Sequence, residues 1–132
     1  MSRRNREQCW LDWLERNMGR RMVWGEFDCA LAGASVGEAL TGTHPRPDLV
    51  GAYSTPLGAY RIIKEAGGLT QLFDEHYERT NPNRVQRGDL VLATDGRKET
   101  ILIHDGRHLL GMAGGRFGIV TGLKTIRAWR VK

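Results

Sequence analysis

Residues 22–32 decide the fold, and they read Met22-Val23-Trp24-Gly25-Glu26-Phe27-Asp28-Cys29-Ala30-Leu31-Ala32. An aromatic–glycine pair leads into Asp28-Cys29, and small and apolar residues continue to Leu40. This pattern predicts a loop that delivers Cys29 to the N-terminus of a helix. The backbone N–H groups and the positive dipole end at that position favour a thiolate over a thiol. Cys29 is therefore a candidate nucleophile, and the alternative is a small buried cysteine at the start of a core helix.

Small residues dominate the helix predicted over Cys29–Leu40. Gly33 and Gly37 lie within it, and each costs roughly 1 kcal/mol relative to alanine in a helix. This cost is tolerable where other backbone must approach closely. We therefore expect a central helix against which a sheet lies.

Helices are also predicted on both sides of this central helix. The residues Trp10, Leu14 and Met18 recur at helical spacing within Arg6–Met18, and Gly19 follows. Ser54-Thr55-Pro56 predicts another helix start, because a hydroxyl cap precedes a proline in the first turn. Its inner face is expected to carry Leu57, Tyr60 and Ile63. A short helix should follow over Leu69–Tyr77.

The spacing of apolar residues changes after Asn81-Pro82-Asn83, from a helical pattern to short runs typical of strands. Short aliphatic runs follow, and the Asp-Gly and Gly-Gly pairs between them favour hairpin turns. The predicted strands are Asp89–Ala93, Thr100–His104, His108–Met112, Gly118–Val120 and Ile126–Val131. A helical part over about 1–80 followed by an antiparallel meander over about 85–132 predicts one α+β domain spanning 1–132.

Composition narrows the class of protein. The two cysteines, Cys9 and Cys29, are too few for a disulfide framework, and His44 and His76 have no partners at metal-ligand spacing, so we expect no metal and no cofactor. The net charge of +5 is spread along the chain without an aromatic platform, so no nucleic-acid partner is expected. The basic N-terminus at Met1 lacks a following apolar run, which predicts no signal peptide and no membrane span.

Two motifs resemble those of NlpC-type cysteine peptidases, which are minimal papain-like hydrolases. Trp24–Cys29 is similar to the aromatic–Gly and Asp-Cys signature at the nucleophile helix of that family. Arg87–Leu92 resembles its Gly-Asp-hydrophobic strand, and Ile101–Gly106 resembles the strand and turn that follow. The resemblance implies an NlpC-like papain-type fold, with N-terminal helices packed on a C-terminal antiparallel β-sheet and Cys29 at the nucleophile position.

The catalytic histidine of that family has no counterpart at its expected place. The resemblance puts Lys98 or Glu99 there, and neither can serve as an imidazole base. His104 and His108 are the remaining imidazoles of the sheet, and they should face each other across a two-residue turn. Either could act as the base for Cys29, and the alternative for both is a structural strand-end histidine.

A narrower resemblance is to small NlpC-like proteins encoded among phage and prophage tail genes. It rests on Phe27–Leu31, on a helix that ends in Gly67-Gly68, and on Arg127–Val131. It implies a catalytically degenerate structural or assembly component of a phage tail tip, made in the bacterial host cytoplasm, with other tail-tip proteins as partners. Two alternatives stay open: an active peptidase or amidase on peptidoglycan stem peptides, and a cytosolic adaptor that binds an anionic partner.

Overall fold

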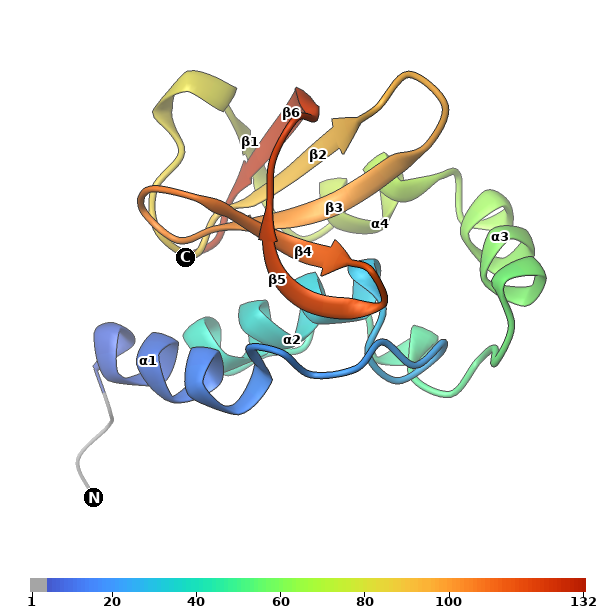
Figure 1. Ribbon diagram of the computed structural model, residues 1–132, viewed down its shortest axis with the longest axis horizontal. Helices are drawn as coiled ribbons and strands as arrows, with labels where there is room; N and C mark the ends of the chain where they lie inside the picture. The colour runs from blue at the N-terminus through green and yellow to red at the C-terminus, as the bar shows by residue number, and fades with distance from the viewer. Residues whose placement is uncertain (1–4) are drawn as a thin grey trace.

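The computed structural model describes residues 5–132 and has the predicted α+β architecture, with helices before the sheet (Figure 1). The helices are α1 (Arg6–Asn17), α2 (Cys29–Thr41), α3 (Pro56–Glu65) and α4 (Leu69–Asp74), with short 3₁₀ turns η1 (Pro47–Leu49) and η2 (Pro82–Arg84). The strands are β1 (Glu78–Thr80), β2 (Leu90–Thr94), β3 (Glu99–His104), β4 (Leu109–Ala113), β5 (Arg116–Val120) and β6 (Lys124–Arg130). The basic start of the chain at Met1 lies outside the described residues.

Local capping explains where the helices begin. The Asn5 side chain accepts a hydrogen bond from the Gln8 backbone N–H at 2.8 Å, which caps α1. Thr55 caps α3 in the same way, and Pro56 occupies its first position, as the sequence predicted. At the other end of α2, Gly42 adopts the left-handed conformation that ends a helix, with φ of 86°.

All strand pairs are antiparallel, and the sheet order is β1-β6-β2-β3-β4-β5. The predicted meander is therefore correct for β2 to β5 and wrong for β6, which lies between β1 and β2. The strand β1 was not predicted, because its three residues are mostly exposed and show no apolar alternation. Pairing with β6 makes them a strand.

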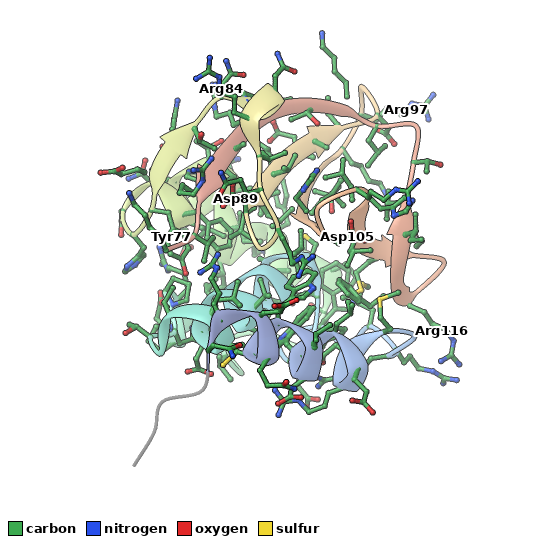
Figure 2. The ribbon with its side chains drawn as sticks, turned by 90° about the vertical axis from the view of Figure 1, so that its left-hand side faces the viewer. Tyr77, Arg84, Asp89, Arg97, Asp105 and Arg116 are labelled. Atoms are coloured by element: carbon green, nitrogen blue, oxygen red, sulfur yellow. The ribbon has the colours of Figure 1, made fainter. Side chains whose placement is uncertain are left out.

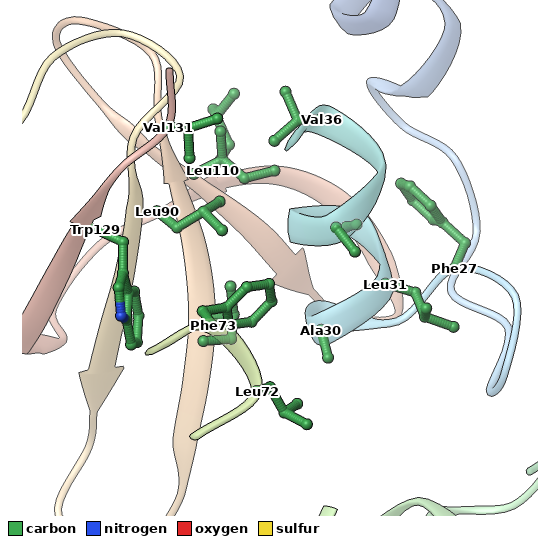
Figure 3. Packing of buried hydrophobic residues seen from close by; sticks show 14 of the residues in the cluster. Phe27, Ala30, Leu31, Val36, Leu72, Phe73, Leu90, Leu110, Trp129 and Val131 are labelled. Atoms are coloured by element: carbon green, nitrogen blue, oxygen red, sulfur yellow. The ribbon is translucent and has the colours of Figure 1, made fainter. Parts of the chain in front are cut away.

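The helix α2 packs closely on the sheet, as its small residues predicted. A Cβ atom added at Gly33 would lie 2.9 Å from Ile101 Cγ2 of β3, so only glycine fits there. Figure 3 shows Leu90 and Phe73 on the sheet side of α2 and Phe27 on its other side. There Phe27 makes an edge contact with Phe117 of β5. A smaller cluster, which includes Val91 and Leu102, is buried on the opposite face of the sheet.

The helix α3 has a different orientation from the predicted one. Leu57 and Tyr60, expected on its inner face, are 57% and 61% exposed, whereas Ala59 is 3% exposed. Helix α3 makes few contacts with the rest of the fold and projects from the side of the molecule (Figure 1). Ile63, the third residue expected there, is partly buried against the core together with Ile62, so that part of the prediction is correct and only Leu57 and Tyr60 point outward.

A buried carboxylate links β6 to the start of β2. Asp89 has no exposed surface and accepts hydrogen bonds from Arg130 Nε at 2.9 Å, the Val131 backbone N–H at 3.1 Å and the Gln86 backbone N–H at 2.8 Å. Figure 2 shows Asp89 in the interior of the side-chain view. These bonds join the residue before β2 to the end of β6, in addition to the backbone pairing of the two strands.

The longest helix among residues 5–132 is α2, with 13 residues, and none of these helices could cross a bilayer, which takes about 20 apolar residues.

Candidate functional site

The loop before Cys29 is fixed by backbone pairing. Val23 and Phe27 exchange two backbone hydrogen bonds, of 2.9 and 2.8 Å, around Trp24-Gly25-Glu26. Gly25 has a φ of 82°, and a Cβ atom there would lie 1.8 Å from the Tyr53 carbonyl oxygen. Glycine is thus required at position 25 for two reasons: its backbone has a positive φ, and the backbone of Tyr53 approaches it closely.

Asp28 connects this loop to α2. Its carboxylate accepts a bond from the Leu31 N–H at 3.0 Å, which caps the helix, and one from the Gly25 N–H at 3.1 Å. A third bond comes from the Tyr53 hydroxyl at 2.7 Å. Asp28 is 1% exposed, so all three bonds are shielded from water. The sequence predicted the cap, and the partner Tyr53, 25 residues away, carried no sequence signal.

Cys29 is the first residue of α2 and is partly buried. Its thiol pKa is raised, first because of burial and further by the charge of Asp28. Hydrogen bonding from the backbone of Ile101 and the side chain of Thr100 lowers this pKa but does not outweigh burial. Burial therefore opposes the thiolate that the helix N-terminus favours at Cys29.

A groove of about 790 Å³ opens beside Cys29 and is called the Cys29 groove here. Trp24 and Cys29 line it together with α3, the turn that ends α3 and the tip of the β2–β3 hairpin. Lys98 and Glu99, where the NlpC resemblance put the family's histidine, are in its lining, and no histidine among residues 5–132 lines it. The groove therefore has the sulfur of a cysteine hydrolase without an imidazole.

The structure places both candidate histidines away from Cys29. Thr100, whose side chain faces the sulfur, and His104 are four residues apart on β3, or roughly 13 Å at about 3.3 Å per residue. His104 Nδ1 accepts a hydrogen bond from the Gly106 N–H at 3.0 Å. His108 lies in the following turn, with Nδ1 3.5 Å from Asp105 Oδ2.

The two histidines are not the expected cross-strand pair either. His104 pairs with Leu109, because the connection is a four-residue turn in which the Asp105 N–H donates to the His108 carbonyl. Neither histidine therefore contacts the other across the strands. The residue that sequence reasoning missed is Thr100, which is next to Glu99 and could have been found by shifting the family alignment by one position.

A family profile described as a domain of unknown function, DUF6950, matches residues 2–131. The chain belongs to the DUF6950 family. No curated protein and no solved structure matches this DUF6950 chain.

The groove of this DUF6950 chain is lined by a thiol, a carboxylate, cations and apolar side chains. Nucleophilic catalysis by cysteine needs a base within hydrogen-bond reach of the sulfur, and among residues 5–132 the groove lining contains no imidazole and one carboxylate, Glu99. No group of three or more histidine, cysteine or acidic side chains among residues 5–132 could hold a metal ion. What the Cys29 groove of this DUF6950 domain does offer is an apolar floor and cationic side chains.

Proposed function

We propose that this chain is a catalytically degenerate NlpC-like protein that serves as a structural or assembly component of a phage tail tip. The degenerate NlpC-like site is supported by Cys29, which lies at the N-terminus of α2 and faces a strand of the sheet. Among residues 5–132, no histidine lines the groove beside it. Thr100 faces the sulfur in place of a base, and the raised pKa of Cys29 opposes thiolate formation at neutral pH.

The tail assignment is supported by the resemblance of Phe27–Leu31 and Arg127–Val131 to the NlpC-like proteins of tail genes. Both segments have structural roles in this fold. Phe27 and Trp129 are 1% and 0% exposed, and they pack on different parts of the same core. A protein that keeps these core features without a base keeps the fold for binding.

An active peptidase is the second candidate, because Cys29 is partly exposed and lines an open groove. Activity would require His104 or His108 to reach the sulfur. The two candidates differ in the alkylation of Cys29 by iodoacetamide, measured against pH in a Cys9→Ser background. For a degenerate site, labelling should be slow at neutral pH, accelerate only above about pH 8.5, and be unchanged by His104→Ala or His108→Ala. Fast labelling at pH 6 that either histidine variant abolishes would establish a working thiolate–imidazole pair instead.

The assembly role is tested in the phage or prophage that encodes the chain. Its gene is deleted, and the wild-type protein or Cys29→Ser is supplied in trans. We expect both proteins to restore infectious particles and to be found in purified tails at a fixed ratio to the other tail proteins. Absence from the tails, or a folded Cys29→Ser protein that fails to restore infectivity, would contradict a non-catalytic assembly role.

A further inference from the structure

We propose that the Cys29 groove binds an acidic, extended segment of a partner protein, an inference that rests on the assembly role proposed above. The groove combines apolar lining residues with exposed cations that make no ion pair among residues 5–132.

The floor of the groove is apolar and accessible. Trp24, Ile63 and Leu69 line it, and Tyr60 stands on its wall with 61% of its surface exposed. The other three tryptophans of the chain are at most 3% exposed, so Trp24 is the one that a ligand could cover. A volume of about 790 Å³ lies in the range of about 300–1,000 Å³ typical of ligand sites.

The rim of the groove is positively charged. Lys64, Arg97 and Lys98 line it, and Glu99 is the only acidic lining residue. None of these three cations makes an ion pair among residues 5–132. The nearest acid in the turn, Asp95, accepts the Arg97 and Lys98 backbone N–H groups at 2.8 Å each. Lys64 Nζ lies 5.6 Å from the centre of the Tyr60 ring. The groove therefore presents exposed cations beside apolar surface, which favours a ligand with carboxylates.

An extended peptide can contact the apolar residues and the cations of the groove at the same time. Its side chains alternate between two faces, so apolar residues can contact Trp24 and Ile63 while alternate Asp or Glu residues face the rim. A single-stranded nucleic acid fits less well, because it needs cations along its whole backbone and a row of aromatic residues for its bases. Here three cations, from α3 and the β2–β3 hairpin, and two aromatic side chains, Trp24 and Tyr60, line the groove, too few for such a track.

The chain supplies a matched control for the rim. Arg97 and Arg107 each follow an Asp-Gly pair, and each backbone N–H donates to the aspartate of its turn, at 2.8 and 2.7 Å. The two arginines flank opposite ends of β3, and only Arg97 lines the Cys29 groove. Figure 2 shows Arg97 at the outer edge of the molecule, well separated from Asp105 of the second turn. Arg97→Glu and Arg107→Glu thus change net charge equally, in equivalent turns.

The experiment measures the binding of two fluorescein-labelled decapeptide pools to the full chain by fluorescence anisotropy. Apolar residues alternate with Asp or Glu in one pool and with Lys or Arg in the other. We expect the acidic pool to bind at least about tenfold more tightly, with affinity falling between about 0.05 and about 0.3 M salt. Arg97→Glu should weaken binding about fivefold, since it replaces attraction by repulsion at a surface pair, and Arg107→Glu should change it less than about twofold.

Equal binding of both pools would overturn the inference, and so would an equal loss of peptide affinity in the two arginine variants. Displacement of the acidic pool by muropeptides or by an oligothymidine, at lower concentration than by the unlabelled pool itself, would also overturn it. Mass spectrometry of the bound pool separates this inference from the proposed function. Cleavage by the wild-type protein but not by Cys29→Ser would leave the binding groove standing and refute the degenerate site. No binding, with normal assembly into tails, would refute the groove alone.

Discussion

Replacing Asp28 by asparagine is expected to destabilise the fold by about 2 kcal/mol. The carboxylate is 1% exposed and accepts three hydrogen bonds. An asparagine oxygen can keep the cap bond from Leu31, because asparagine caps helices as well as aspartate does. Its amide group would then face the Gly25 N–H, donor against donor, and a buried unsatisfied donor costs about 1–3 kcal/mol.

Two further variants divide this cost between the bonds. Tyr53→Phe removes one hydrogen bond to a charged group and should cost about 1.5 kcal/mol. Asp28→Ala removes the cap and leaves all three donors without a partner, so we expect about 4 kcal/mol. The assay is urea unfolding followed by tryptophan fluorescence, with the slope of the free energy against urea unchanged from the wild type.

The matched control is Asp95→Asn. Asp95 also accepts two backbone N–H bonds, but it is exposed in the β2–β3 turn, where water replaces lost partners, so the loss should stay below about 1 kcal/mol. A cost for Asp28→Asn within about 0.5 kcal/mol of that control would refute the reasoning. It would mean that the Asp28 carboxylate does not hold the loop before Cys29.

Three other predictions concern separate sites. Gly37→Ala puts a Cβ atom 2.2 Å from the buried, unpartnered Tyr77 hydroxyl, so it should cost about 1–3 kcal/mol, and Tyr77→Phe should recover most of that cost in urea unfolding. The bidentate ion pair with Arg79 holds the pKa of Asp74 at about 2, below its usual value. Asp74→Asn should therefore lower the free energy of unfolding by about 1 kcal/mol at neutral pH, a value that allows for solvent screening. The difference in stability from the wild type should disappear as pH falls from about 4 towards 2, where Asp74 becomes protonated. A difference that stays constant with pH would exclude the ion pair as its cause. Thr100→His puts an imidazole opposite Cys29 and should lower the apparent pKa of its alkylation; an unchanged pH profile would mean that this side chain does not reach the sulfur.

Local signals in the sequence predicted most of the elements and the position of the sulfur. Caps at Asp28 and Thr55 fixed two helix starts, because a polar side chain and three following residues suffice for this interaction. The glycines of α2 predicted the close approach of β3, because lost side-chain volume has a direct steric meaning. The hairpins of β2 to β5 followed from Asp-Gly and Gly-Gly pairs.

Long-range properties could not be predicted in this way. Burial, which raises the pKa of Cys29, depends on every element around it, whereas the helix dipole that favours a thiolate is visible in the local sequence. The outward orientation of Tyr60 depends on how few contacts α3 makes with the sheet. Pairing of β6 with β1 joins residues about fifty positions apart, and its pairing with β2 joins residues about thirty to forty apart; no turn signal between neighbours specifies such connections.

The position of β6 between β1 and β2 has a consequence for synthesis. A nascent chain that has emerged only as far as Leu123 has the helices and β2 to β5 outside the ribosome, but β2 then has one open edge and Asp89 lacks Arg130. Trp129, which fills the core between Phe73 and the sheet, is still absent. Exposed strand edges and apolar surface invite pairing with other chains. Completion of the sheet is therefore expected only after Arg130 has emerged, and a ribosome stalled before β6 should carry a chain that is sensitive to proteases and a target for chaperones.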